Sequence, residues 1–391
     1  MANGAAPWEL VRLLPNLRLP SVSDDTWTDA VYVTGRETLT LRSTWAAIVP
    51  NDDPRLLAFL ETHPTGKRLV ESFIGPYGQP VAPAALITRQ DAPIPRRTDA
   101  IAAYRNAVAA CFTLRGHAAA LTEQPTAGRG AWSDLFDFHP AEVDKGDSIQ
   151  IHSAALLHMM GKPKQLAFAP SPYVDTVLDL RHCDQELSML LSKAWHRAYV
   201  RRRERLLFRP VFRSLEIAFL AAAIPVKNVG SLYDFGLTVS LWVASLEALL
   251  WPVNRSASQE NSVRFLSATG LDDRRLEARR FGLKYGSRTV RANYLQKACS
   301  LLYRARNAFM HGDAFTARNL QPWPTRPDAN LIQVAPIVYR QALLRRLYDF
   351  FSKPEATDWA DIDSETIASW FTEDVFENAL LNAFGLEDLE W

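Results

Sequence analysis

The spacing of apolar residues along the chain changes near residue 185. Before this point, short alternating segments rich in β-branched residues predict strands. They lie at 31–33 and 38–41, which a glycine-containing turn joins into a hairpin, and at 149–152 and 173–180. Apolar residues at helical spacing predict one helix over 99–121, and prolines at 80, 83, 93 and 95 predict a loop. Residues 1–185 are therefore predicted to form a mixed α/β domain.

After residue 185, apolar residues recur every three or four positions and strand signals are almost absent. Asp184 is a candidate N-cap for a first helix, in which Leu187, Leu191 and Trp195 share one face. Pro225 and Pro252 are expected to end the second and third helices. These two helices are predicted at 214–223 and 237–250, and further helices at 260–268, 291–310, 336–351 and 364–384. The predicted fold class is α+β: an N-terminal mixed α/β domain, 1–185, followed by an all-α helical bundle, 186–391, whose last helices are acidic.

Charge is strongly segregated, although the whole chain is nearly neutral, with 44 Lys and Arg and 43 Asp and Glu. Residues 197–213 contain seven arginines and one acid, and residues 264–306 contain eleven basic residues and three acids. After Lys353 there are eleven acids and no basic residue. Such basic segments favour a polyanionic partner such as RNA, and solvated helix faces balanced by an acidic tail are the alternative.

Composition argues against several classes of protein. Three well-separated cysteines, Cys111, Cys183 and Cys299, form no CxxC pair, so neither a disulfide framework nor a structural zinc site is expected. The first 19 residues lack the basic and apolar segments of a secretory signal. The two most apolar stretches, 215–226 and 237–251, are shorter than a membrane span, and each contains a glutamate. We therefore expect a cytoplasmic protein without a membrane segment, a metal or a cofactor.

The candidate chemistry lies in one segment, 301–312, with the sequence LLYRARNAFMHG. On a helix one face of this segment is apolar, whereas Asn307 and His311, four residues apart, project from the opposite side with Arg306 beside them. An imidazole exchanges a proton near neutral pH, and a guanidinium stabilises the extra charge of a pentavalent phosphate. The three side chains are therefore competent for phosphodiester cleavage without a metal.

The same segment has a structural interpretation. His311 comes directly before Gly312. A histidine in the last turn of a helix interacts favourably with the helix dipole, and a glycine adopts the left-handed conformation that ends a helix. Spacing and capping alone favour this interpretation over a catalytic one.

The segment, together with Ser-Leu-Glu-Ala-Leu-Leu at 245–250, resembles the HEPN domain family (higher eukaryotes and prokaryotes nucleotide-binding), and in particular its ApeA-like members. The signature of that family is an arginine, usually followed by a polar residue, and then a histidine after four to six intervening residues. Arg306, Asn307 and His311 match these places. Arg304 fits the longer spacing, but an alanine follows it, so Arg306 is the better candidate. The resemblance covers about residues 186–350.

The resemblance implies a metal-independent endoribonuclease, often a toxin or phage-defence effector, that cleaves RNA in a groove between two copies of the domain. His311 would assist attack by the 2′-hydroxyl or protonate the leaving group, Arg306 would hold the scissile phosphate, and Asn307 would orient the pair. Glu247 resembles the acidic position of an earlier helix and would pair with an arginine across the bundle, or form an ordinary ion pair. A homodimer is expected, because residues five apart on a helix point about 140° away from each other.

Weaker candidates remain open. Arg304, Arg201, Arg202 and Arg205 would follow RNA phosphates, or would form a solvated helix face. A further polar cluster, formed by Asp137, His139, Asp144, Asp147 and His152, lacks a closed metal-ligand pattern. The absence of a glycine-rich phosphate loop and of a GxSxG motif argues against an NTPase or a serine hydrolase. The alternative function is a non-catalytic HEPN scaffold that binds RNA or a protein, and either function allows an activating ligand or protein.

Overall fold

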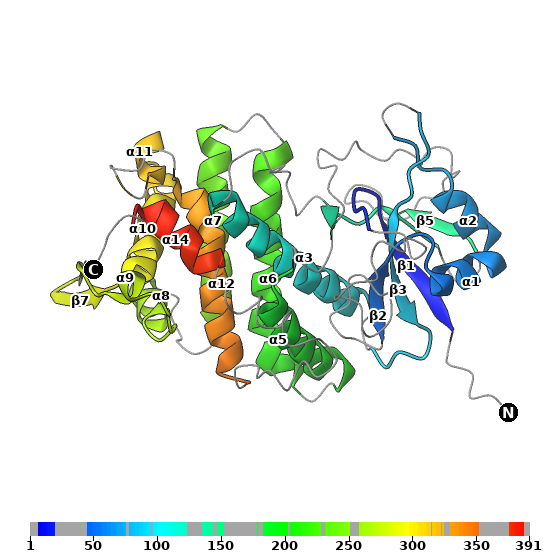
Figure 1. Ribbon diagram of the computed structural model, residues 1–391, viewed down its shortest axis with the longest axis horizontal. Helices are drawn as coiled ribbons and strands as arrows, with labels where there is room; N and C mark the ends of the chain where they lie inside the picture. The colour runs from blue at the N-terminus through cyan, green and yellow to red at the C-terminus, as the bar shows by residue number, and fades with distance from the viewer. Residues whose placement is uncertain are drawn as a thin grey trace.

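The structure of the chain is a computed structural model in which a small sheet-containing part lies beside a larger helical part (Figure 1). It describes residues 7–19, 45–75, 78–94, 97–122, 135–143, 147–151, 178, 183–201, 204–227, 231–250, 258–313, 315–321, 323, 329–351 and 375–386. The mixed α+β class is confirmed. The predicted hairpin at 31–41 and the predicted end at Pro252 lie outside the described residues, as does the predicted strand at 173–180 apart from Leu178.

The N-terminal sheet has three antiparallel strands in the order β1-β3-β2. They are β1 (Trp8–Leu14), β2 (Ala46–Val49) and β3 (Ala84–Arg89). Two hydrophobic clusters cover its opposite faces, because successive side chains of a strand point to opposite sides. Ile48 and Leu86 belong to the main core, which includes helix α3 (Arg97–Thr122), whereas Val49 and Ile87 pack with α1 (Pro54–Thr62) and α2 (Pro64–Val70).

This sheet is not predicted from the sequence, and the prediction of a loop marked by Pro80, Pro83, Pro93 and Pro95 is wrong for β3. Both β2 and β3 are short and buried on both faces. Residues 46–49 and 84–87 are therefore continuously apolar and lack the alternation that marks a half-buried strand. The predicted strand at residue 149 is confirmed as β5 (Ile149–Ile151), which pairs with β4 (Ala141–Val143).

The helical part begins at Asp184, as predicted, where the carboxylate accepts a hydrogen bond from the Leu187 N–H at 3.1 Å. Helix α5 (Gln185–Trp195) continues into a π-helical turn, η4 (His196–Val200). Two long helices, α6 (Arg205–Lys227) and α7 (Leu232–Leu250), pack against each other along their lengths. The other helices are α8 (Gln259–Leu266), α9 (Arg274–Glu277), α10 (Tyr294–Met310), α11 (Ala317–Leu320), α12 (Leu331–Tyr348) and α14 (Val375–Phe384).

Helix α7 is the one described helix that is long and apolar enough to cross a membrane, by length and composition alone. It packs against α6, α10 and α12, as the core helix of a bundle does. Three helices extend beyond their predicted bounds. Helix α6 begins at Arg205 and runs past Pro225, α7 begins at Leu232, and α12 contains Pro336 instead of beginning there. A proline has a helical φ and removes one hydrogen bond, a loss that burial of the apolar helix face outweighs here.

The C-terminal part is not all-α, which corrects the prediction for residues 186–391. Strands β6 (Phe281–Tyr285) and β7 (Arg288–Ala292) form an antiparallel hairpin, and α10 therefore begins at Tyr294 and not at residue 291. Gly286 and Ser287 form its two-residue turn, and Gly286 has a φ of +59°. A glycine at the first central position matches the twist of a tight hairpin. The apolar alternation at 281–285 followed by Gly-Ser is the signal that would have predicted it.

Helix α3 connects the two parts of the molecule (Figure 1). At the sheet, the Tyr104 hydroxyl donates to the Ala46 carbonyl at 3.1 Å. In the helical part, the Trp195 indole donates to the Ala100 carbonyl at 2.9 Å, and α3 packs against α5, α6, α12 and α14. The sequence analysis assigns this helix to the N-terminal domain, but its side chains form one continuous core with the C-terminal helices.

A buried ion pair joins the elements of the helical part. The Arg340 guanidinium, in α12, donates from Nε to Asp184 at 2.8 Å and from Nη2 to both Asp184, at 3.2 Å, and Glu186, at 3.3 Å. Both Arg340 and Asp184 are buried. The Asp184 N–H donates to the Cys111 carbonyl of α3 at 3.0 Å, and the guanidinium lies 3.9 Å from the centre of the Phe376 ring of α14. One charge pair therefore connects α3, α5, α12 and α14.

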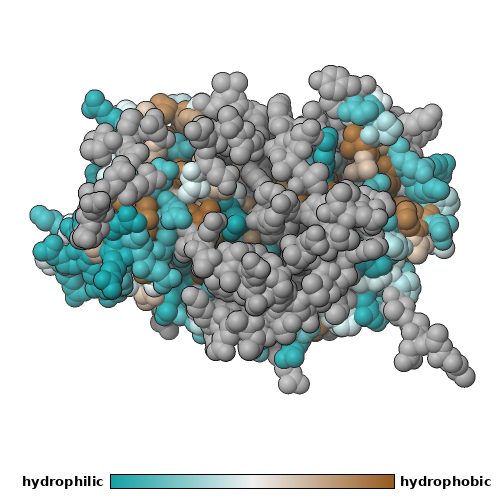
Figure 2. Space-filling view, in the orientation of Figure 1, coloured by the Kyte–Doolittle hydropathy of each residue, from teal (hydrophilic) through white to brown (hydrophobic). Residues whose placement is uncertain are grey.

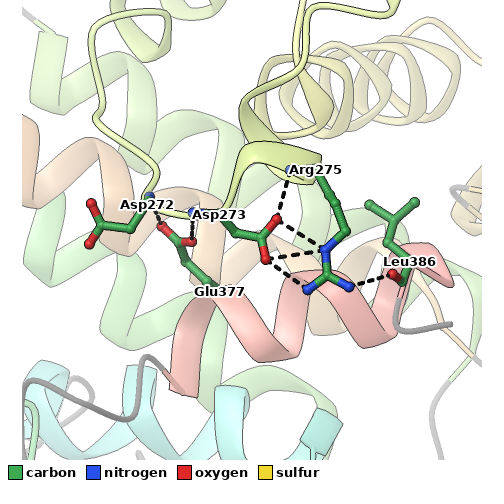
Figure 3. Close-up of polar contacts among 5 residues, drawn as sticks. All are labelled: Asp272, Asp273, Arg275, Glu377 and Leu386. Atoms are coloured by element: carbon green, nitrogen blue, oxygen red, sulfur yellow. Dashed lines mark hydrogen bonds and ion pairs between the residues drawn. The ribbon is translucent and has the colours of Figure 1, made fainter. Parts of the chain in front are cut away.

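A second polar cluster fixes α14 to the loop before α9 (Figure 3). The Glu377 carboxylate accepts the N–H groups of Asp272, at 2.7 Å, and Asp273, at 2.6 Å. Asp273 caps α9 and binds the Arg275 guanidinium, which also donates to the Leu386 carbonyl at 3.0 Å. Glu377 belongs to the acidic stretch after Lys353. At least this acid of the stretch is therefore used to bind backbone N–H groups of its own chain.

Arg340→Ala should lower the free energy of unfolding by ~3–5 kcal/mol, because it leaves Asp184 buried without its counter-charge. Urea denaturation measures this loss. The control is Arg264→Ala, which removes an exposed ion pair with Glu260 and should cost at most ~1 kcal/mol. The double variant Arg340→Met/Asp184→Asn should recover part of the stability, because both buried charges are gone. Equal losses for Arg340→Ala and Arg264→Ala would contradict the central place of this ion pair.

Candidate active site

The segment 301–312 forms the second half of α10 and its C-terminal cap, as predicted. A capping box fixes the start of the helix: the Asn293 side chain accepts the Gln296 N–H at 2.9 Å, and the Gln296 side chain accepts the Asn293 N–H at 3.0 Å. Leu302 and Ala305 are buried on the core side, as the apolar pattern predicts. The other side of the last two turns is therefore open to solvent.

The end of α10 confirms the capping interpretation of Gly312, which has a φ of +75°. The His311 N–H donates to the Asn307 carbonyl at 2.9 Å, and the Asp313 N–H donates to the Ala308 carbonyl at 3.0 Å, which is the pattern of a left-handed glycine cap. These bonds use only the backbone of His311. Its side chain is exposed, and no hydrogen bond within the described part of the chain engages the imidazole. Capping and proton transfer are thus compatible at this residue.

Arg306 and Asn307 interact directly. The Arg306 guanidinium donates from Nη1 to the Asn307 side-chain oxygen at 3.0 Å, and both side chains are partly exposed. This bond holds the amide oxygen toward the guanidinium, so the amide nitrogen and the remaining guanidinium N–H groups stay available as donors. The arrangement places Asn307 where it can orient the Arg306 guanidinium.

A polar group lies behind Arg306, between α7, α8 and α10. Burial raises the pKa of Glu247, while the charge of Arg306 and hydrogen bonding by the Tyr303 hydroxyl oppose this rise. The Tyr303 hydroxyl lies 2.7 Å from the Ser262 hydroxyl, and burial raises the pKa of this tyrosine strongly. The charge of Arg306 acts on Glu247 across the bundle, but within the described part of the chain the two side chains form no direct ion pair. The sequence analysis misses Tyr303 and Ser262, because nothing in a local pattern links them to Glu247.

The structure does not bring Arg306 and His311 together within one chain. They are five residues apart on α10, so their side chains leave the helix about 140° apart. Arg304 is seven residues before His311, which places the two on the same side of the helix, and both are exposed. Within one chain, Arg304 is therefore better placed than Arg306 to act beside the His311 imidazole, although the sequence motif favours Arg306.

The exposed side chains at the end of α10 allow only a narrow range of chemistry. Residues 304–313 contain no serine, threonine or cysteine, so the exposed part of the segment offers no hydroxyl or thiol nucleophile. An exposed imidazole can take or give a proton, and exposed guanidinium groups can bind phosphate bidentately. The group thus suits a substrate that supplies its own nucleophile.

The N-terminal turn of α7 lies against the C-terminal turn of α10. A Cβ atom at Gly236 would come within 2.1 Å of the Phe309 ring, so only glycine allows this approach. Large apolar side chains are exposed around this contact: Tyr233 is 79% exposed, Leu237 44% and Met310 56%. Exposed apolar side chains grouped beside a polar motif are typical of an interaction surface.

The arginines at the start of α6 lie far from the exposed residues at the end of α10. Arg205 donates to Asp99 of α3 at 3.1 Å, Arg201 is exposed in the turn before α6, and Arg202 lies outside the described residues. Phe309 packs against the first turn of α7, next to the end of α6 at Lys227. Since 22 residues of helix separate Arg205 from that end, about 33 Å lies between them. The two basic segments therefore lie at opposite ends of α6 and do not form one continuous surface within a single chain.

Among the weaker candidates, Asp147 and His139 have structural partners, whereas Asp144 and His152 lie outside the described residues. The Asp147 carboxylate accepts the N–H of Thr65 at 3.0 Å, and His139 is buried against the ring of Phe73. Among the residues that the structure describes, no group of three or more His, Cys, Asp or Glu could hold a metal ion. The three cysteines are unpaired and buried.

Comparisons with protein-family models, with curated proteins and with solved structures find no significant match to this chain.

Glu247→Gln should change how stability depends on pH. Burial raises the folded pKa of Glu247 above its ordinary value of 4.5, so the folded chain binds more protons than the unfolded chain between these two values. Wild-type stability therefore falls as pH rises through this window, and the glutamine variant lacks that fall. The stability of the variant relative to wild type should be higher at about pH 7 than at about pH 4.

Urea denaturation at both pH values measures this difference. Adding Arg306→Gln to both proteins should enlarge it, because Arg306 lowers the pKa of Glu247. Glu216→Gln, at an exposed glutamate of α6, controls for removal of one negative charge. A difference that stays constant with pH would show that Glu247 does not carry a raised pKa.

Proposed function

We propose that this chain is a metal-independent endoribonuclease of the HEPN type that acts as a toxin or phage-defence effector. The observation that carries the proposal is the exposed imidazole of His311 at the end of α10, with Arg304, Arg306 and Asn307 within the preceding two turns. From residue 278 to residue 312 the chain has no acidic side chain. A phosphodiester that approaches this surface therefore meets cations and a proton carrier, and Asp313 is the first acidic residue after them in the sequence.

RNA supplies the nucleophile that the segment lacks. His311 would take the proton of a 2′-hydroxyl, whose oxygen attacks the adjacent phosphorus, and the bond from phosphorus to the 5′-oxygen would break. Arg306 would stabilise the extra negative charge of the pentavalent intermediate, held in place by Asn307. A second imidazole would protonate the departing 5′-oxygen. The products are a 2′,3′-cyclic phosphate and a 5′-hydroxyl end.

The second imidazole would come from a second copy of the chain. A two-fold axis beside the end of α10 would place the His311 of one copy near the Arg306 of the other, which the 140° separation prevents within one chain. The exposed Tyr233, Leu237 and Met310 surround this end and would be buried in such a dimer. A homodimer through the helical part is therefore part of the proposed function.

A non-catalytic HEPN scaffold, which binds RNA or a protein, is the second candidate. The observation that favours it is the glycine cap after His311, together with the bond between Arg306 and Asn307. Both features have a structural use that needs no substrate. Under this candidate, Arg306→Ala and His311→Ala weaken stability or binding, and neither the wild type nor the variants cleave RNA.

His311→Ala should reduce RNA cleavage by a factor of at least ~100, because it removes the proton carrier. Wild-type cleavage should persist in EDTA and leave 2′,3′-cyclic phosphate ends, which gel electrophoresis with end-group analysis detects. His311→Asn is the matched variant, because asparagine keeps a polar residue before the glycine cap but cannot carry the proton. It should keep wild-type stability and lose activity. If the alanine variant cleaved as fast as the wild type, the roles assigned to α10 would be wrong.

Leu237→Glu/Met310→Glu should convert a dimer of the 44.0 kDa chain into a monomer, because two charges would be buried at the interface. Sedimentation velocity with and without RNA measures the mass. Leu206→Glu is the control, since Leu206 is 82% exposed at the opposite end of α6. A wild-type chain that stays monomeric even with RNA bound would exclude the shared groove.

A further inference from the structure

The hairpin β6–β7 has one anchored face. Leu283 and Ala292 are buried, and the Phe281 ring meets the Tyr294 ring edge to face at 4.9 Å between centres. Tyr294 in turn stacks on Phe384 of α14 at 5.2 Å. These contacts fix the base of the hairpin to the core, so the direction in which its other face points is set by the fold.

The outer face of the hairpin has no partner within the described part of the chain. Gly282 lies opposite Arg291, and Lys284 lies opposite Thr289, and all four residues are exposed. Lys284 and Arg291 are diagonal neighbours on this face, at a Cα separation of roughly 7–8 Å. Two like charges at this distance repel each other, and a partner of opposite charge would remove that repulsion.

The positive charge continues beyond the two strands. Figure 2 shows a broad hydrophilic area at the end of the molecule where the hairpin lies in Figure 1. Eight basic residues and no acid lie between residues 278 and 312: Arg279, Arg280, Lys284, Arg288, Arg291, Lys297, Arg304 and Arg306. The pKa of Lys297 is lowered by burial and further by the positive charge of Arg304, seven residues further along α10. This concentration of positive charge favours binding of a polyanion.

The chemistry of the face favours a phosphate backbone over an acidic protein. Protein interfaces have an apolar, aromatic centre and are depleted in lysine. The outer face of the hairpin presents glycine, threonine, lysine and arginine, and no apolar side chain. A flat cationic strand pair without an apolar anchor can bind phosphates along a strand but offers little to a folded partner.

Helix α10 leads from the hairpin to the candidate active site. Lys297, Arg304 and His311 follow each other at seven-residue intervals, so they lie on one side of the helix. Lys297 and His311 are 14 residues apart, which is about 21 Å along the axis. Six phosphates of a helical strand, at ~3.4 Å each, cover the same distance.

We infer that the outer face of β6–β7 binds the sugar-phosphate backbone of the RNA substrate. The contacted phosphates lie several nucleotides away from the scissile bond, which lies at His311. The inference rests on the proposed function for the identity of the strand. The hairpin contributes affinity and substrate length preference, and it takes no part in the bond-breaking step.

The test compares Lys284→Gln/Arg291→Gln with Arg209→Gln/Arg213→Gln, which removes the same charge from two exposed arginines of α6. All chains carry His311→Ala so that the RNA stays intact. Binding to a 20-nucleotide single-stranded RNA is measured by fluorescence anisotropy over a range of salt. The hairpin variant should bind on the order of tenfold more weakly, and its salt slope should fall by ~1.4, since each phosphate contact contributes ~0.7. The α6 variant should match the parent chain, and Lys284→Arg/Arg291→Lys should keep the affinity.

A cleavage assay with His311 intact separates this inference from the proposed function. The hairpin variant should raise the KM for the 20-nucleotide RNA and leave cleavage of a tetranucleotide unchanged, because the shorter RNA does not reach the hairpin. Hairpin-dependent binding without any cleavage would support the inference and reject the proposed function. Unchanged RNA affinity in the hairpin variant, or an equal loss of RNA affinity in the α6 variant, would overturn the inference. Poly-glutamate, measured in the same anisotropy assay, represents an acidic protein partner. If the hairpin variant lost binding to poly-glutamate and kept binding to RNA, the inference would also be overturned.

Discussion

A guanidinium that is removed from water has to be neutralised where it lies, and Arg340 meets this requirement with Asp184, Glu186 and the face of Phe376. These partners come from two elements, α5 with its N-cap and α14. The Asp184 carboxylate caps α5 and accepts hydrogen bonds from Arg340 of α12, and the backbone N–H of the same residue donates to α3. One residue therefore joins three helices. Helix α12, which carries Arg340, packs against α10. The orientation of the candidate active site therefore depends on a charge pair in the centre of the helical part.

Local chemistry accounts for what the sequence predicts correctly. The Asp184 cap, the course of α3 and the core side of α10 each depend on residues within a few positions of one another, and such patterns are visible in one dimension. The end of α10 at Gly312 is of the same kind, because only the backbone conformation of a single residue is involved. The exposed position of His311 follows from this helix and its cap.

Distant contacts account for what the sequence does not predict. Asp184 and Arg340 are 156 residues apart, and Glu377 reaches back 105 residues to Asp272, so no local spacing marks either pair. The central strand β3 is apolar on both faces and looks like any buried segment. Which end of α6 lies nearer to α10 is likewise a property of packing, since both arginine-rich segments look equivalent in sequence.

The contact between Gly236 and Phe309 has a mechanical consequence. The Phe309 ring fills the space that any side chain at position 236 would need, so it blocks rotation of the last turn of α10 about the helix axis. A rotation that turned Arg306 toward His311 within one chain would have to pull this aromatic ring out from against α7. The angular setting of the imidazole is thus locked by an apolar contact, and any signal that changes it has to act on the spacing between α7 and α10.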